Sequence, residues 1–261
     1  MGFDLDAYQR SVEPVVVDDL DMDLFRTVPL RPEHLRCLCY AHDVEMHTSC
    51  YLRNLLNTRA HGDPEITAFL TLWSFEEYWH GEALARVMGA HGEPAGPARV
   101  AALRKRQGWR ANAAPLGWWA FSAANPHFLA VHMTFGVINE WSTQAGYARL
   151  AAQADHPVLG PLLQRIMRQE GRHIDYYLAQ ARGRLAHSIG AQRTTRAMLR
   201  AIWSPVGHKV LPRAESRHQV RTLFGDGEGR SAAARIDRRI DALPGLAGLR
   251  LLSQAVDRYG S

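Results

Sequence analysis

Two segments of the chain each place a glutamate three residues before a histidine, inside a run of apolar residues. The first pair is Glu77 and His80, and the second is Glu170 and His173. Residues three apart lie on one face of a helix, so both side chains of a pair can reach the same object. A carboxylate buried without compensation costs several kcal/mol, so something must neutralise it. Divalent metal ions bind both carboxylate and imidazole groups.

A second pair of glutamates lies upstream at matching distances. Glu45 precedes Glu77 by 32 residues, and Glu140 precedes Glu170 by 30. In an antiparallel helical hairpin, about fifteen residues up, a short turn and about fifteen down return the chain to the same level, at a rise of about 1.5 Å per residue. This donor set is typical of helical bundles that hold two iron or two manganese ions. The predicted metal ligands are Glu45, Glu77, His80, Glu140, Glu170 and His173.

The doubled pattern carries this prediction, because a single Glu-x-x-His match is weak evidence. With 12 Glu and 13 His in 261 residues, chance alone gives about 0.6 matches. A third match, Glu215 and His218, follows a basic stretch with no glutamate at hairpin distance, and we interpret it as a surface feature. The alternative to metal is a network of buried salt bridges with Arg165, Arg168 and Arg172.

Four helices are expected to position the six residues. Proline at a first helical position, with a capping Asp or Asn before it, marks helix starts at Pro64 and Pro126, and Pro32 marks another. Short links join the first helix to the second and the third to the fourth, whereas a Gly- and Pro-rich crossover of more than thirty residues joins the second to the third. The expected helices span residues 32–58, 64–90, 126–154 and 157–185.

This connectivity is that of ferritin-like bundles. We therefore predict an all-α fold, a ferritin-like four-helix bundle with a long crossover and additional C-terminal helices. The expected domains are a di-iron helical bundle over residues 1–186 and a basic helical extension over residues 187–261 that packs on the bundle.

The amino-acid composition limits which classes of protein are possible. The 46% hydrophobic and 22% charged residues are ordinary for a globular protein. No run of eighteen apolar residues suggests a membrane span, and the N-terminus lacks the basic and apolar regions of a secretory signal. We therefore expect a cytoplasmic protein. Three cysteines, Cys37, Cys39 and Cys50, crowd into one segment and are expected to be reduced thiols.

The net charge of +5 is spread unevenly along the chain. Residues 181–261 contain 15 Arg and Lys against 6 Asp and Glu, a net charge of +9. Such a surface can face an acidic protein, a nucleic acid or only water. No zinc knuckle or aromatic-studded basic loop supports nucleic acid, so none is expected as a partner.

At this point the sequence resembles a known family. "FEEYWHGEAL" is similar to the Glu-Glu-x-x-His-Gly helix of the soluble acyl-carrier-protein desaturases, a branch of the ferritin-like di-iron enzymes, and "QEGRHIDYY" is similar to their Asp-Glu-x-Arg-His helix. The resemblance covers about residues 32–185. Gln169 stands where that family usually has an aspartate, and Gly171 replaces a long side chain. Three smaller matches are Tyr51 six residues after Glu45, Thr143 three residues after Glu140, and Trp73 one turn before Glu77.

The resemblance implies a dioxygen-dependent, non-haem di-iron oxidase that desaturates an acyl chain carried on an acyl carrier protein. It implies two iron ions as cofactor, Thr143 as a catalytic residue beside the oxygen pocket, and Tyr51 and Trp73 in the substrate channel. The chain shows no flavin, haem or iron–sulfur motif, so an external donor such as a ferredoxin must supply electrons. The expected partners are an acyl carrier protein or carrier-bound substrate, a ferredoxin-like reductant and a second copy of the chain in a homodimer.

Other functions on the same cofactor stay open. The first is hydroxylation or N-oxygenation of a natural-product intermediate, and the second is a ferritin-like iron-binding protein or metal-binding scaffold without an organic substrate. The basic C-terminal segment has two interpretations as well. Its arginines can attract an acidic partner, or the helix that carries them covers the bundle through Ala232, Ile236 and Ile240. The arginines in question are Arg230, Arg235, Arg238 and Arg239.

Overall fold

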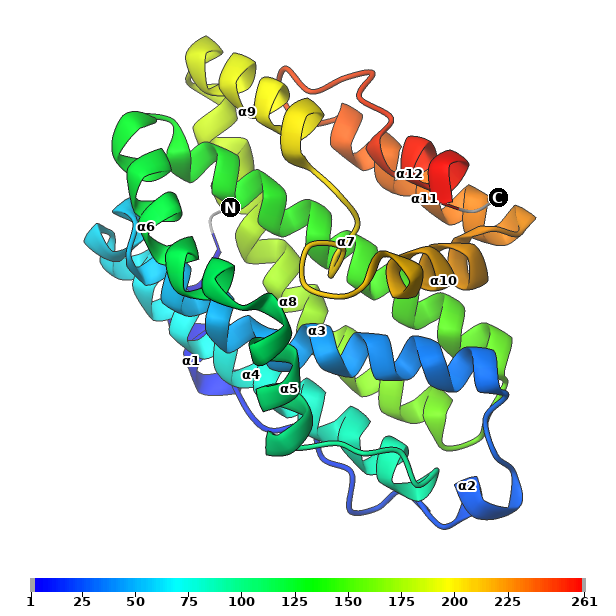
Figure 1. Cartoon of the computed structure of the whole chain (residues 1–261). Helices are drawn as coiled ribbons and strands as arrows, with labels where there is room; N and C mark the ends of the chain where they lie inside the picture. Colours follow the sequence, from blue (N-terminus) through cyan, green and yellow to red (C-terminus); the bar gives the residue numbers. More distant parts are fainter. Residues whose placement is uncertain (1–2, 260–261) are drawn as a thin grey trace. The chain divides into compact units, whose positions relative to one another are not determined.

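The computed structural model describes residues 3–259, with residues 110 and 111 as backbone only. Over these residues it contains twelve α-helices and no strand (Figure 1). The predicted all-α class is confirmed, and the ferritin-like bundle stays a prediction. Contacts between Cα atoms divide the chain into two compact units, and α7 and α8 contribute residues to both. The N-terminal unit is Asp4–Ala124 with Leu150–Gln169, and the C-terminal unit is Met1–Phe3, Asn125–Arg149 and Glu170–Ser261.

A helical hairpin forms the centre of the N-terminal unit. Helix α3 (Pro32–Leu56) and helix α4 (Pro64–Ala90) pack along each other and are joined by a 3-10 turn at Arg59–Gly62. The Asp63 carboxylate accepts hydrogen bonds from the first backbone N–H groups of α4, at 3.1 and 3.2 Å. This is the cap that the sequence predicts, and it fixes where α4 begins.

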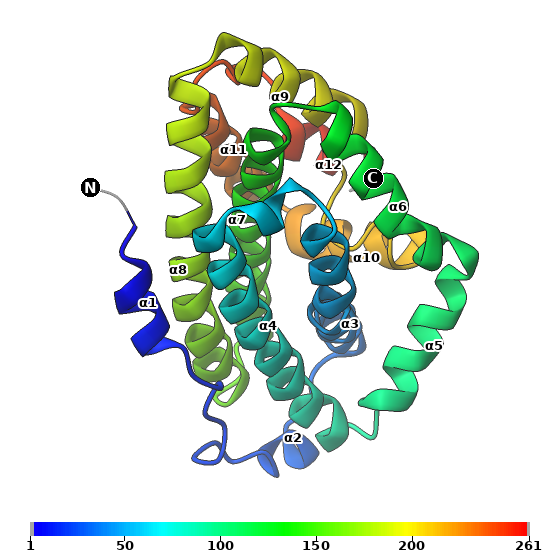
Figure 2. The ribbon, with the colours of Figure 1, turned by 90° about the vertical axis from the view of Figure 1, so that its left-hand side faces the viewer.

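The long crossover folds into two further helices of the same unit. Helix α5 (Pro97–Gln107) lies between Gly96 and Gly108, both at positive φ, and helix α6 (Trp109–Ala124) follows. Glycine suits these junctions because positive φ is unfavourable for residues with a Cβ atom. Both helices pack against α3, and Figure 2 shows them on the side of α3 that faces away from α4.

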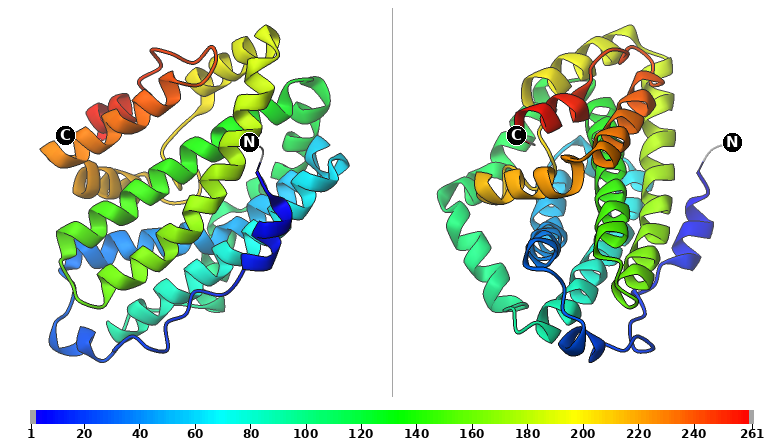
Figure 3. Two further views of the ribbon diagram at one scale, coloured as in Figure 1. Left: turned by 180° about the vertical axis from the view of Figure 1, so that it is seen from behind. Right: turned by 90° about the vertical axis from the view of Figure 1, so that its right-hand side faces the viewer.

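The N-terminal segment lies along the outside of this unit. It contains helix α1 (Leu5–Ser11) and helix α2 (Leu24–Thr27), which both contact α4 (Figure 3). The buried Tyr8 hydroxyl donates a hydrogen bond of 2.7 Å to Glu76 Oε2 on α4. Farther along, the Arg165 guanidinium pairs with Asp19 at 2.6 Å and donates to the Val16 carbonyl. These contacts hold residues 8–19 against the helices.

The C-terminal unit contains most of helix α7 (Phe128–Ala154) and the second half of helix α8 (Leu159–Ala186). Four helices follow: α9 (Ile189–Ile202), α10 (Arg213–Phe224), α11 (Gly227–Asp241) and α12 (Leu251–Tyr259). Helices α10, α11 and α12 pack against one another, as Figure 3 also shows. Arg149 of α7 donates to the Leu223 carbonyl and pairs with Asp226. The last helices are therefore anchored on α7.

Helix α11 uses its apolar side and part of its basic side for packing. Ala232, Ile236 and Ile240 are buried, as the covering interpretation expects. Arg230 pairs with Asp257 at 3.0 Å. Arg239 lies over the ring of Trp141 on α7, 5.8 Å from its centroid, within the range of a cation–π contact. Arg235 and Arg238 are also exposed.

Two expectations from composition agree with the structure. Among the described residues, no helix combines the length and the apolar character that crossing a membrane requires. The three cysteines are thiols and form no disulfide with one another, and Cys37 and Cys39 are buried. Burial raises the pKa of the Cys39 thiol to about 11, so this group stays protonated and unreactive near neutral pH.

Asp237 provides a test of how the C-terminal helices hold together. Its buried carboxylate accepts hydrogen bonds from the backbone N–H groups of Leu252 and Ser253, both at 2.9 Å, and from the Ser253 hydroxyl at 2.6 Å. Replacing Asp237 by alanine leaves these donors without their acceptor, so the free energy of unfolding should fall by about 1–3 kcal/mol. Urea denaturation measures this loss.

The matched control is Asp257→Ala, which removes the exposed pair with Arg230. Exposed ion pairs contribute about 0–1 kcal/mol, so this variant should unfold close to the wild-type midpoint. Equal losses in the two variants would show that Asp237 does not cap α12.

Candidate metal centre

Helices α3 and α4 bring three of the predicted ligands together inside the N-terminal unit. Glu45, Glu77 and His80 are all buried. His80 Nδ1 lies 3.8 Å from Glu77 Oε1 and 3.9 Å from Glu45 Oε2. These distances are too long for hydrogen bonds. They suit donors that share one divalent ion, because metal–ligand bonds of about 2.0–2.2 Å place neighbouring donors about 3–4 Å apart.

A glycine permits this close approach of the two helices. A Cβ atom on Gly81, the residue after His80, would meet Met46 Sδ at 2.5 Å and Glu45 Cβ at 3.5 Å. A larger residue would therefore displace the Met46 side chain beside the ligands. Close packing at this position thus explains the glycine that follows the histidine in "WHGEAL".

The other three predicted ligands belong to the C-terminal unit. Glu140 on α7 is buried, and Glu170 and His173 on α8 have no exposed surface. His173 Nδ1 lies 3.1 Å from Glu170 Oε2, one helical turn away. Gly136, one turn before Glu140, allows α7 to contact the ring of Tyr177, one turn after His173. Close helix packing again accompanies the polar residues.

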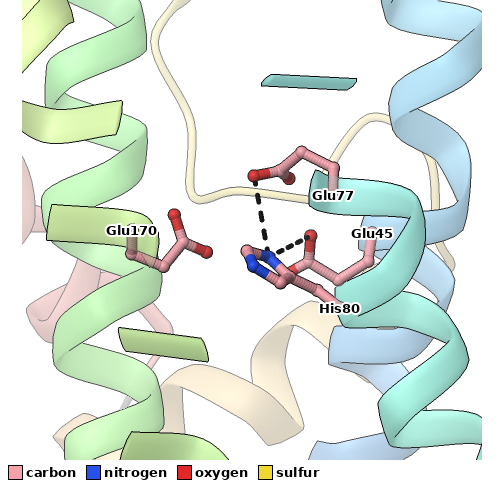
Figure 4. Close-up of side chains that lie close together, drawn as sticks. All are labelled: Glu45, Glu77, His80 and Glu170. Atoms are coloured by element: carbon pink, nitrogen blue, oxygen red, sulfur yellow. Dashed lines mark ion pairs between the residues drawn. The ribbon is translucent and has the colours of Figure 1, made fainter. Parts of the chain in front are cut away.

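Two overlapping groups of buried ligand atoms result. Within each group, one ligand atom from every residue lies within 4.8 Å of all the others, and Glu77 and Glu170 occur in both groups. Figure 4 shows the first group, with the ion pairs from His80 to two glutamates drawn as dashed lines. All six predicted ligands take part, and their binding of metal stays a prediction. The groups are Glu45, Glu77, His80 and Glu170, and Glu77, Glu140, Glu170 and His173.

The charges of these groups favour a bound cation. Two carboxylates at about 4 Å repel each other by about 4 kcal/mol at an effective dielectric constant of about 20, and four carboxylates contribute here. The alternative was neutralisation by arginines. Arg165 instead pairs with Asp19 and the Val16 carbonyl, and Arg168 is exposed. Arg172 is half-buried directly before His173, so neutralisation by this arginine stays an alternative. The residues present therefore fit a bound metal ion in donor type, burial and spacing.

Gln169 orients the imidazole of His80. The Gln169 side-chain amide donates from Nε2 to the backbone carbonyl of Glu13 at 2.9 Å, and its Oε1 lies 2.9 Å from His80 Nε2. A carbonyl only accepts hydrogen bonds, so the NH2 group must face Glu13 and the oxygen must face His80. His80 Nε2 therefore carries the proton. The lone pair is on Nδ1, the atom that faces Glu45 and Glu77, as a metal ligand requires.

Gln169 stands where the family that the sequence resembles usually has an aspartate, and here its amide oxygen makes the hydrogen bond to His80. An amide oxygen accepts from the imidazole but carries no charge, so it fixes the ring without drawing the proton away from Nε2. The Glu13 carbonyl and the Tyr8–Glu76 contact were not expected from the sequence. Glu76 is fully buried next to Glu77 in the chain but belongs to neither ligand group of the described residues.

The remaining predicted site residues lie near the ligands in the sequence, and they differ in the contacts that they make. Tyr51 is half-buried, and its ring makes edge-on contacts with Trp73 at 6.2 Å and with Trp118 of α6 at 5.7 Å between centroids. Thr143 is half-buried on α7, one turn after Glu140. Their roles in a channel and at an oxygen pocket stay predictions. Glu215 and His218 join neither ligand group of the described residues, and both are half-buried, so their interpretation as a surface feature stays a prediction.

Comparisons of the chain with models of protein families, with curated proteins and with solved structures find no match. The resemblance to the desaturases therefore rests on the residues quoted above.

The tautomer of His80 is directly measurable in metal-free protein. Long-range ¹H–¹⁵N NMR, at a pH well above the ordinary histidine pKa of about 6.5, should show the proton on Nε2. In Gln169→Leu the acceptor is lost, so both tautomers should be populated and Zn²⁺ affinity should fall by about 10–100-fold.

Gln164→Leu is the matched control, because Gln164 is exposed on the same helix. It should leave both the tautomer and the affinity unchanged. A wild-type His80 protonated on Nδ1 would show that Gln169 does not orient the ring as described.

Proposed function

We propose that this protein is a dioxygen-dependent di-iron oxidase. The observation that carries the proposal is the pair of overlapping ligand groups, in which Glu77 and Glu170 occur twice. Glu77 and Glu170 would be shared by two ions, and each ion would take two of the four further ligands. Two bound iron ions would supply the redox chemistry that activates dioxygen for attack on an unactivated carbon. The proposed ligands are Glu45, Glu77, His80, Glu140, Glu170 and His173.

The protein's own groups would orient and shield this chemistry. The burial of all six ligands excludes water from their surroundings, which strengthens each electrostatic interaction there. Gln169 keeps the lone pair of His80 on Nδ1. The hydroxyl of Thr143 would donate a hydrogen bond or move a proton beside Glu140. Tyr51 and Trp73, in contact through their rings, would form an apolar wall for the substrate.

An acyl chain carried on an acyl carrier protein is the proposed substrate. The support is the resemblance of the two Glu-x-x-His helices to the carrier-protein desaturases, together with the aromatic row of Tyr51, Trp73 and Trp118. A ferredoxin-like donor would provide electrons, and Arg235 and Arg238 are exposed cations of α11 that an acidic partner would meet. A homodimer is proposed as the assembly.

Two alternatives use the same ligand groups. Hydroxylation or N-oxygenation of a natural-product intermediate would consume dioxygen but leave acyl chains unchanged. A ferritin-like iron protein would oxidise iron without any organic substrate. Dioxygen consumption with a reductant and acyl-carrier substrates, followed by mass spectrometry of the acyl chain, distinguishes these alternatives from desaturation.

Iron content tests the ligand assignment. Wild-type protein loaded anaerobically should hold two Fe²⁺ ions per chain. Glu77→Ala and Glu170→Ala each remove a carboxylate common to both groups, so iron content should fall by half or more. Elemental analysis after removal of loosely bound metal provides the measurement.

The control for these variants is Glu65→Ala, an exposed glutamate on α4, which should keep both ions. Circular dichroism shows whether each variant is folded. Retention of two ions by folded Glu170→Ala would contradict the proposed site.

Thr143→Val tests the oxygen pocket. The change is nearly isosteric and removes only the hydroxyl, so iron content should be unchanged while a larger share of the electrons goes to hydrogen peroxide. Thr134→Val is the matched control on the same helix, because the Thr134 hydroxyl donates to the Ala130 carbonyl of its own helix. Equal coupling in wild type and Thr143→Val would show that this threonine only packs.

A further inference from the structure

Helix α6 exposes an apolar face, which is unusual for a surface helix. Trp109, Leu116 and Trp119 have 75%, 66% and 53% of their surface exposed. They are seven and three residues apart, so they share one side of the helix. Ala113 and Ala120 lie on the same side and are exposed as well. A solvated helix normally has charged or polar residues on its outer face, whereas Asn112 is the one polar residue among the six exposed positions of this face.

The opposite side of α6 is held against the unit. Asn57 Nδ2 donates to the Pro115 carbonyl at 2.9 Å, and the Arg59 guanidinium donates to the carbonyls of Ser122 and Ala123 at 2.9 and 3.0 Å. Trp118, on this inner side, contacts Tyr51 of α3. The apolar face is therefore exposed on a helix that is docked by its other side.

The charged residues of α5 and α6 themselves all have one sign. From Pro94 to Asn139 the sequence contains no Asp or Glu. The last turn of α5 carries Arg104, Lys105 and Arg106, all exposed, immediately before Trp109. An apolar helix face beside a basic cluster is the composition of segments that lie in the interface of anionic membranes.

We propose that α5 and α6 form a docking surface for a membrane that contains anionic lipids. Trp109, Leu116 and Trp119 would enter the boundary between headgroups and acyl chains, and the basic turn of α5 would meet the headgroup phosphates. Tryptophan suits this boundary because its ring is apolar while its N–H finds a polar partner. A second copy of the chain would bring the same positive charge to the face, which disfavours it as the occupant.

This docking goes beyond the proposed oxidase function and does not depend on a bound metal. The inferred link between this docking surface and the acyl substrate does rest on the proposed oxidase function. Trp118 on the inner side of α6 touches Tyr51, which touches Trp73, so an acyl chain at the membrane surface would lie next to the residues proposed for the channel.

Flotation of the full-length protein with lipid vesicles tests the docking surface. The vesicles are phosphatidylcholine alone, or phosphatidylcholine with phosphatidylglycerol. The wild-type protein should float with the anionic vesicles and stay behind with the neutral ones, and added salt should weaken its binding. Trp109→Ala, Leu116→Ala and Trp119→Ala combined should lower partitioning by tenfold or more. Arg104→Glu, Lys105→Glu and Arg106→Glu combined should do the same, because each basic residue contributes about fivefold near an anionic surface.

Two control variants match these changes in chemistry. Val16, Ile189 and Ile202 are exposed apolar residues elsewhere, and their combined replacement by alanine should leave flotation unchanged. Arg235→Glu with Arg238→Glu reverses exposed charges on α11 and should have little effect. Circular dichroism verifies that each variant is folded.

Three results would overturn the proposal. The first is failure of the wild-type protein to float with anionic vesicles. The second is wild-type flotation by the folded α6 triple variant. The third is a dimer, or a complex with an acidic carrier protein, that the α6 triple variant loses while vesicle binding is unaffected. Loss of iron in any variant concerns the oxidase proposal alone, since flotation is measured on metal-free protein as well.

Discussion

Buried carboxylates whose oxygens lie within 4.8 Å of one another must be neutralised, and this constraint governs the six predicted ligands. Glu77 and Glu170 each take part in two groups of acidic and imidazole side chains. Without a cation or bound protons their repulsion would destabilise the folded state by several kcal/mol. Ions that bind only the folded state add their binding free energy to its stability. Metal binding and folding of this protein should therefore be coupled.

The residues around the ligands hold donor atoms in an orientation that a cation can use. His80 presents Nδ1 to two glutamates because Gln169 accepts from Nε2, and Gln169 is itself fixed by the Glu13 carbonyl. Gly81 lets α3 approach α4 at this level. The N-terminal segment thus supports the ligands although it contributes none of them.

The helices, and the grouping of the six side chains in space, were predictable where they depend on local rules. Helix α4 matches its expected bounds because Asp63 and Pro64 mark its start. The ligand groups were predictable since a spacing of three residues fixes a helix face and equal hairpin arms align two helices. The Glu13–Gln169 bond joins residues 156 positions apart through a backbone carbonyl, for which no side chain gives a signal. The crossover was expected only as a connection, yet Pro97 at a first helical position and two glycines at positive φ delimit a helix there.

Anomalous diffraction at the iron absorption edge, from crystals of the Fe²⁺-loaded protein, tests the central claim most directly. Two peaks per chain are expected, one among Glu45, Glu77, His80 and Glu170 and the other among Glu77, Glu140, Glu170 and His173. Absence of peaks at both groups in fully loaded protein, or iron bound only elsewhere, would contradict it.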